Sequence, residues 1–170
     1  MGCPMLEGAQ PRGKNMTKKN LILSVGILAL AVVATTAFVY ANADMEEDEV
    51  KSLIESAYLN GAFNDLDTKS MRGGFHPVFE IHGVKDGELS QYPIDDWIKS
   101  IDKRKASPDF KPEDQKWDYK FVYVDVTGVA ASAKIELSKD GTHVYTDYLS
   151  LLKLKDGWKI TDKVYVKHTD

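Results

Sequence analysis

"YTDYLSLLKLKDGWKITDKVYV", residues 145–166, contains two extended runs on either side of a short turn. Both runs are rich in β-branched, aromatic and leucine side chains, which fit a pleated and partly buried surface. Asp156-Gly157 separates them, and this dipeptide between two strand-like runs is a strong hairpin signal. The end of the chain is therefore predicted to be an antiparallel hairpin.

The same signals repeat toward the N-terminus, where Gly128 and Asp140-Gly141 separate further strand-like runs. Tight connections of this kind imply antiparallel neighbours. Four consecutive antiparallel strands are predicted, at 117–127, 129–138, 142–154 and 158–168.

Two of these strands, 117–127 and 142–154, carry apolar residues on both faces. A sheet with one solvated face would instead alternate cleanly between apolar and polar residues. One face is therefore expected to cover helices and the other to meet a second copy of the chain, which predicts a homodimer through the sheet face. Strict alternation places four aromatic residues on one face of the first strand: Trp117, Tyr119, Phe121 and Tyr123.

Three helices are predicted in the first half of the domain. Residues 44–65 form the first, because apolar residues recur there with helical spacing. A second, short helix runs from Asp67 or Thr68 to Met71, and a third begins at Pro93. Residues 75–92, with Asp86-Gly87 at their centre, are predicted to form a hairpin between the second and third helices.

Three stretches carry a resemblance to a known family: residues 57–79, 94–101 and 145–166. They resemble the nuclear transport factor 2-like superfamily, and the last two are most similar to its branch described as "putative lumazine-binding". The resemblance implies an α+β cone, in which a curved antiparallel sheet wraps around three helices. The element order would be α-α-β-β-α-β-β-β-β.

A leader is predicted to precede this domain. Residues 21–40 contain no charge, Lys18 and Lys19 come just before them, and Ala-Asn-Ala follows at 41–43. These features are typical of a secretory signal peptide cleaved after Ala43, with Met16 as the expected start. The prediction is a leader over 1–43 and a single periplasmic or secreted domain over 44–170. An uncleaved leader could instead anchor the protein, since twenty apolar residues can cross a bilayer.

Charge and cysteine content exclude several classes of function. The formal net charge of the chain is −4, and removal of the basic leader makes the remainder more acidic. Nucleic-acid binding and docking on anionic lipid both need a basic surface, so neither is expected, nor is stable membrane association after cleavage. Cys3, the single cysteine, lies in the leader, which argues against disulfides and cysteine-based chemistry in the domain. We find no phosphate-binding loop or nucleophile motif, and no cofactor is predicted.

"MRGGFHPVFEIHG", residues 71–83, is a candidate site. On one strand, His76, Glu80 and His82 would project to the same side and could bind a divalent metal. Pro77 disturbs the start of that strand, and no third histidine is near in the sequence, so no metal site is predicted. The family resemblance places this segment near the mouth of the cone, which implies that His76 is a rim residue; a purely structural histidine is the alternative.

Asp147 is the second candidate, because it lies in the middle of a strand that is predicted to be buried. An unpaired carboxylate there would be costly or would take up a proton. Asp147 could pair with a neighbour such as Lys163 and only orient the sheet. Alternatively it could act as an acid or base, as the resemblance to ketosteroid isomerases and polyketide cyclases implies. Asp125 gives a weaker signal of the same kind.

A pocket is predicted from aromatic residues with polar tips, which suit a cavity for a partly apolar molecule. The same residues could instead simply be core or dimer interface. The leading hypothesis is an exported binding or accessory domain without chemistry. The alternatives are a proton-transfer enzyme that uses Asp147 or His76, and a protein-interaction module. The residues predicted to bind the ligand are Tyr92, Trp97, Trp117, Tyr119, Asp147 and His76.

Overall fold

The computed structural model describes residues 44–168. The predicted leader and its cleavage site after Ala43 lie outside the described residues. Three helical segments precede or interrupt the strands: residues 44–53 continuing directly into the π-helix η1 (Ile54–Asn64), then α2 (Thr68–Gly74) and α3 (Ile94–Lys105). A short 3₁₀ turn, η2 (Pro112–Gln115), lies in the charged loop before the last four strands.

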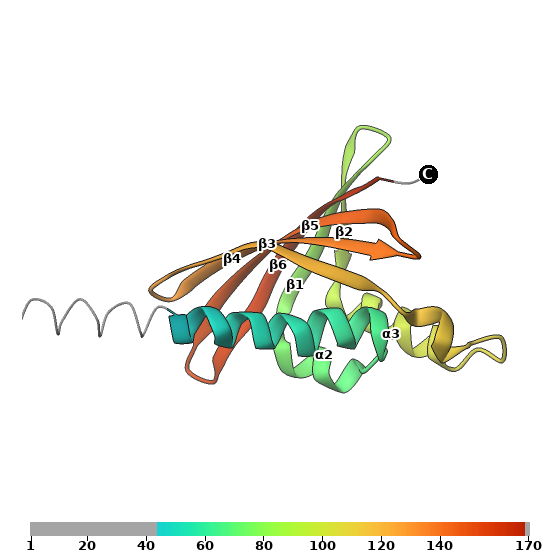
Figure 1. The fold of residues 1–170 in the computed structure, drawn as a ribbon, viewed down its shortest axis with the longest axis horizontal. Coiled ribbons are helices and arrows are strands. Elements are labelled where there is room, and N and C mark those ends of the chain that lie inside the picture. The colour runs from blue at the N-terminus through green and yellow to red at the C-terminus, as the bar shows by residue number, and fades with distance from the viewer. Residues whose placement is uncertain (1–43, 169–170) are drawn as a thin grey trace, which may run out of the picture. The chain divides into compact units, whose positions relative to one another are not determined.

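Six strands form one sheet in the order β2-β1-β6-β5-β4-β3. Figure 1 shows this sheet curving over the helices, which all lie on one side of it. The strands are β1 (Phe75–Lys85), β2 (Glu88–Pro93), β3 (Asp118–Thr127), β4 (Ala130–Lys139), β5 (Thr142–Leu154) and β6 (Gly157–Lys167). The predicted α+β fold class, its element order and the four-stranded meander are confirmed. The sheet is mixed rather than wholly antiparallel, because β1 pairs with β6 in parallel.

Local chemistry explains where these elements begin and end. The Asp67 carboxylate caps α2 by accepting hydrogen bonds from the backbone N–H groups of Lys69 (3.0 Å) and Ser70 (3.2 Å). In the first hairpin, Asp86 and Gly87 both adopt positive φ (54° and 84°), as a two-residue turn between twisted strands requires. The sequence signals for these boundaries are therefore physical constraints on the backbone.

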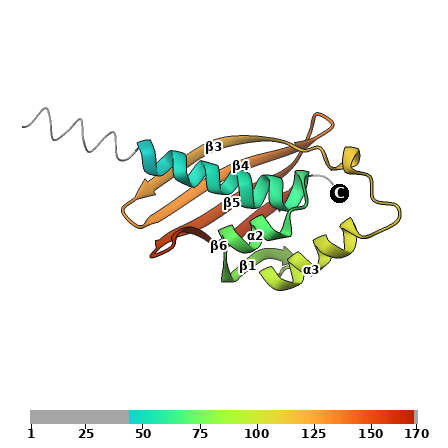
Figure 2. The ribbon, with the colours of Figure 1, turned by 90° about the horizontal axis from the view of Figure 1, so that it is seen from below.

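The hydrophobic core lies between the helices and the concave face of the sheet. Figure 2 views the ribbon from below, with the helices in front of the sheet. Ile135 and Leu149 of the central strands and Ile54 and Ile98 of the helices are almost wholly buried. Among residues 44–168, no helix is long and apolar enough to cross a membrane.

Strict alternation fails along β3, which corrects one prediction. The pairing with β4 shifts between Phe121 and Tyr123, so that Phe121 is opposite buried Ile135 and Tyr123 is opposite Lys134. A bulge of this kind adds a residue to one strand and reverses the side-chain direction beyond it. Tyr123 therefore does not share the inner face with Trp117 and Phe121.

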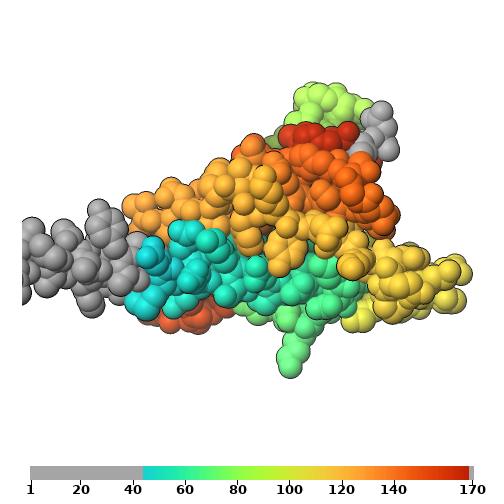
Figure 3. Space-filling model, viewed as in Figure 1, coloured from blue at the N-terminus to red at the C-terminus, as the bar shows by residue number. Residues whose placement is uncertain are grey.

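The outer face of the sheet carries exposed apolar side chains in register. Val164 of β6 is opposite Tyr148 of β5, and Tyr148 is opposite Lys134 of β4. Tyr148, Val164 and Val166 are 38%, 44% and 51% exposed. Figure 3 shows the space-filling surface in the orientation of Figure 1, with β3, β4 and β5 along its upper part. Isolated apolar residues on a surface need no explanation, but a row of them in neighbouring strands marks a candidate contact surface.

Candidate functional site: an aromatic pocket that ends on a buried lysine

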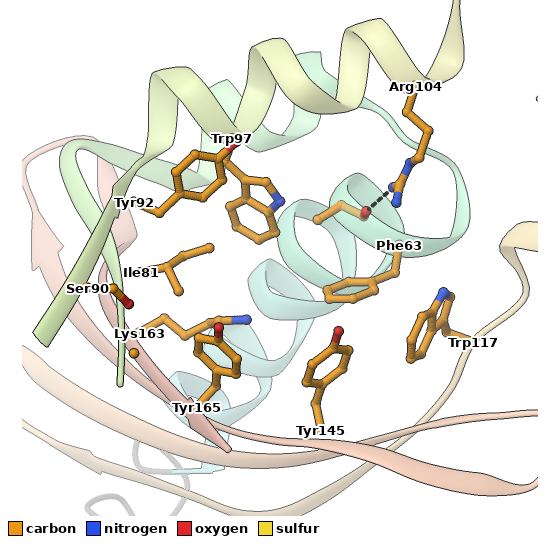
Figure 4. A pocket seen from close by; sticks show the side chains of 12 residues that line it. Phe63, Ile81, Ser90, Tyr92, Trp97, Arg104, Trp117, Tyr145, Lys163 and Tyr165 are labelled. Carbon is orange, nitrogen blue, oxygen red and sulfur yellow. Dashed lines mark hydrogen bonds between the residues drawn. The ribbon is translucent and has the colours of Figure 1, made fainter. Parts of the chain in front are cut away.

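A cavity of about 380 Å³ opens between α3, the end of η1 and the concave side of the sheet. Figure 4 shows aromatic side chains around it and the Lys163 amine pointing toward its interior. Six aromatic residues contribute to its lining: Phe63, Tyr92, Trp97, Trp117, Tyr145 and Tyr165. The volume is in the range of pockets that hold small organic molecules.

The aromatic walls are held by contacts with one another and with the backbone. Trp97 of α3 stacks on Phe79 of β1, with ring centroids 6.1 Å apart. The ring of Trp117 stacks on that of Tyr145, with centroids 5.9 Å apart. The Asn64 side-chain oxygen accepts a hydrogen bond from the backbone N–H of Trp117 at 2.7 Å. Asn64 is the last residue of η1, so the end of that helix fixes one wall. These contacts hold the rings in place around the cavity.

Two cations and no carboxylate are found among the described residues that line the cavity. Arg104 donates a hydrogen bond to the Ala62 carbonyl oxygen at 3.2 Å, drawn as a dashed line in Figure 4. Its remaining N–H groups can serve a ligand, because a guanidinium has five donors. Lys163 is the second cation. The pocket therefore favours a neutral or negatively charged ligand over a cation.

Lys163 belongs to a buried polar triad at the end of the cavity. Its Nζ donates to the Tyr58 hydroxyl oxygen at 2.9 Å and lies 3.2 Å from Asp147 Oδ1. The Tyr58 hydroxyl in turn donates to Asp147 Oδ2. Asp147 Oδ1 accepts no directed hydrogen bond from the described residues, so its contact with Lys163 is an ion pair governed by distance. Asp147 and Tyr58 are fully buried, and Lys163 is 5% exposed.

Burial is the main influence on the pKa values of Lys163 and Tyr58. It lowers the pKa of Lys163, while the Asp147 charge opposes that shift. Burial also raises the pKa of Tyr58 well above its ordinary value, and the nearby Asp147 charge adds to the effect. Tyr58 therefore stays neutral and donates. The rings of Tyr58 and Tyr165 each lie 5.1 Å from Lys163 Nζ, which favours a cation at that position.

The six predicted ligand residues occupy different places. Tyr92, Trp97 and Trp117 line the cavity. Asp147 lies behind it, in contact with Lys163 and Tyr58. Tyr119 is not among the lining residues, and its hydroxyl donates to Glu55 at 3.3 Å.

His76 borders a separate hollow of about 130 Å³ next to Asp95. A register shift in β1 separates it from Glu80 and His82. His82 Nδ1 lies 2.7 Å from Asp162 Oδ1, and its Nε2 lies 3.3 Å from Glu80. Within residues 44–168, no three His, Cys, Asp or Glu side chains are grouped to hold a metal.

Sequence reasoning identified the pairing of Asp147 with Lys163, and this ion pair is present. It missed that Lys163 faces a cavity and that Tyr58, which lies within the first predicted helix, completes the triad. One signal was available. Lys163 lies on a strand predicted to pair with the apolar strand 142–154, and a lysine buried there needs a partner, a ligand, or both.

Known proteins resemble this chain over the whole described domain. The sequence model of the family described as "Putative lumazine-binding" matches residues 45–166. The aldolase FrzH of Cladobotryum sp. is 27% identical over 119 residues, covering 69% of this chain and 90% of that protein.

Solved structures with the same fold include NTF2-like proteins of unknown function. One from Shewanella baltica OS155 has 26% identity and a TM-score of 0.59, covering 74% of this chain and 96% of that one. Another, from Methylobacillus flagellatus KT, has 23% identity and a TM-score of 0.55, covering 72% and 91%. These likenesses support the NTF2-like fold.

Proposed function

The chain belongs to the family described as "Putative lumazine-binding", and from this membership and the pocket we propose that the domain binds a small, flat, partly apolar molecule with an oxygen acceptor. The observation that carries the proposal is the cavity of about 380 Å³ with aromatic walls and a lysine amine at its end. Rings select flat apolar bodies, and the amine selects an oxygen at one end.

The contacts of Lys163 leave at least one of its donors for a ligand. An ammonium has three N–H groups. Tyr58 accepts one at 2.9 Å, and Asp147 Oδ1 lies 3.2 Å from the nitrogen. The third can point into the cavity, where a ligand carbonyl or carboxylate oxygen would receive a charge-assisted hydrogen bond.

Binding of 2-naphthoate, a flat aromatic carboxylate, tests this proposal by isothermal titration calorimetry. We expect the double variant Lys163→Met/Asp147→Asn to bind about tenfold or more weakly, because a hydrogen bond to a charged group contributes about 1.5–3 kcal/mol. The pair is changed together so that no charge is left buried alone. Lys159→Met is the matched control: Lys159 is on the same strand, but its Nζ contacts the Gly73 carbonyl away from the cavity. Equal affinity in all three proteins would refute the proposed role of the pocket.

A second candidate function, an enzyme, is favoured by one feature of the site. The triad joins an amine, a hydroxyl and a carboxylate at the end of a cavity, which is the equipment of proton transfer. The similarity to a protein described as an aldolase points the same way, at low identity. Asp147 is fully buried, so in such an enzyme it would act through Lys163 and Tyr58.

We also propose that the domain is exported and forms a homodimer. The leader pattern of residues 1–43 supports export, and the exposed row of Tyr148, Val164 and Val166 supports pairing through the outer sheet face.

Native mass spectrometry of the exported protein should give twice the mass of residues 44–170. Val164→Glu should give the single-chain mass, whereas Val84→Glu, at the exposed tip of the first hairpin, should leave the dimer intact. A wild-type monomer would contradict the dimer, and a retained leader would contradict cleavage.

A further inference from the structure

We propose that Lys163 forms an iminium bond with an aldehyde or ketone held in the aromatic pocket, so that the ligand class of this site is carbonyl compounds. The inference rests on the proposed function, because the carbonyl compound must first enter the cavity. It goes further, since it assigns Lys163 a covalent role that simple binding does not need.

The position of Lys163 provides the geometry for attack. Its stem runs along β6 at the wall of the cavity, and Figure 4 shows its amine between Tyr165 and Trp97, facing the interior. Tyr58 and Asp147 hold the nitrogen from behind, at 2.9 and 3.2 Å. A carbonyl group that enters between the rings would therefore meet the nitrogen from its open side. Bringing two molecules together in the right orientation costs entropy, which is a large part of the barrier to their reaction. A pocket that orients the carbonyl beforehand removes this part of the barrier.

The reaction balances without any further reagent. Lys163 first passes one ammonium proton to Asp147 through the Tyr58 hydroxyl, which accepts from Lys163 and donates to Asp147, and this frees the nitrogen lone pair. The nitrogen then bonds to the carbonyl carbon, and the carbonyl oxygen takes up one proton returned by Asp147 and one from the nitrogen, and leaves as water. The sum is an ammonium plus a carbonyl giving an iminium plus water, with the positive charge still on nitrogen. No electron is gained or lost.

The surroundings that hold the ammonium would also stabilise the product. The iminium carries the same charge at the same nitrogen, so the Asp147 carboxylate remains its counter-ion. The rings of Tyr58, Trp97 and Tyr165 lie 5.1–5.5 Å from that nitrogen and favour a cation there. Tyr58 acts as a positioning residue, because its hydroxyl bridges the nitrogen and the carboxylate.

Lys163 also differs from the surface lysines in its readiness to lose a proton. Burial lowers its pKa, whereas hydrogen bonds with neighbouring acids raise the pKa of Lys99 and Lys153. A neutral amine is the nucleophile, so the desolvated lysine reacts first. This supports the geometric argument and predicts which lysine should be modified.

Reductive trapping with 2-naphthaldehyde and cyanoborohydride tests the inference, because hydride converts an iminium into a stable amine. We expect one naphthylmethyl group per chain on the peptide that contains Lys163, with labelling about tenfold above that of any surface lysine because the pocket orients the probe. Lys163→Arg should abolish this label, since a guanidinium forms no such bond under these conditions. Lys159→Arg should keep it.

The matched carboxylate separates failure of the chemistry from failure of the pocket. 2-Naphthoate binding is therefore measured on the wild-type protein in parallel with trapping of 2-naphthaldehyde, because the two probes share the naphthyl body and only the aldehyde can form an iminium. Naphthoate binding together with labelling spread evenly over surface lysines would overturn the iminium and leave the proposed binding function intact. If naphthoate does not bind and Lys163 is not labelled, both proposals fail.

Discussion

Replacing Asp147 with alanine is expected to lower the free energy of unfolding by about 3–5 kcal/mol, because it removes one partner of a buried ion pair. Asp147 is fully buried, and Lys163 is 5% exposed. The truncation would leave the ammonium without a counter-ion and the Tyr58 hydroxyl without its acceptor. Urea denaturation of the purified protein measures the effect as a lower midpoint with an unchanged slope.

Asp125→Ala is the matched control for this prediction. Asp125 was the weaker candidate aspartate in the sequence and also lies on a strand, but it is exposed on β3. Its removal should change the free energy of unfolding by no more than about 0.5 kcal/mol. Equal loss of stability in the two variants would contradict a stabilising role for the buried triad of Asp147, Tyr58 and Lys163.

The cost of Asp147→Ala should also depend on pH in a definite direction. Burial lowers the pKa of Lys163 in the folded protein below its ordinary value of 10.5, and loss of the Asp147 charge lowers that pKa further. Between this lowered pKa and 10.5, the unfolded chain binds more protons at Lys163 than the folded protein does. The free energy of unfolding therefore rises with pH in this window, and it rises more in the variant, whose folded-state pKa is lower. The deficit of the variant relative to wild type should therefore shrink as pH rises through that window. A deficit that grows with pH would contradict a buried, unpaired lysine as its cause.

Local signals predicted most of the fold, whereas pairing between distant segments was hidden. Asp86-Gly87 and Asp140-Gly141 specify turns by the positive φ of their residues, so the hairpins follow from the sequence. The parallel pairing of β1 with β6 joins segments about 80 residues apart, such as Ile81 and Lys163. No dipeptide encodes it, because it depends on how the helices fill the space below the sheet.

The same limit explains which parts of the site were missed. Trp97 and Trp117 were predicted as pocket residues from their type, and both line the cavity. Tyr145 and Tyr165 line it as well, yet the strand that carries Tyr145 is apolar on both faces, and alternation alone does not say which face is concave. The bulge in β3 also turns the Tyr123 side chain to the other face of the sheet, and no sequence pattern predicted this bulge. Side-chain direction was therefore the weakest part of the prediction.

Substitution of Gly74 by alanine is the second change with a large expected effect, a loss of about 1–3 kcal/mol in stability through overpacking. Gly74 ends α2 and is buried against the helix that precedes it. A Cβ atom there would overlap the Cβ of Ala57 and lie 3.0 Å from Leu53 Cδ1. Since one of the overlapping groups is a short side chain fixed to a helix backbone, α2 must shift to relieve the contact.

Gly73→Ala supplies a control one residue away. A Cβ at Gly73 would meet nothing within 4 Å, so alanine should be neutral or slightly stabilising by about 0.5–1 kcal/mol, as it restricts the unfolded chain. Thermal unfolding of the two variants side by side measures the difference. Equal stability would show that α2 is not packed closely on the first helix.

A shift of α2 should also reach the pocket. Phe75 directly follows Gly74, and its ring meets Trp97 edge-on at 5.7 Å and Tyr58 at 6.3 Å. Movement of Phe75 would loosen the packing of Trp97 in the wall of the cavity and of Tyr58, which positions Lys163. Gly74→Ala should therefore weaken 2-naphthoate binding at temperatures where the variant is still folded, whereas Gly73→Ala should not. The close approach of two helices at one glycine thus sets both the stability of the domain and the shape of its cavity.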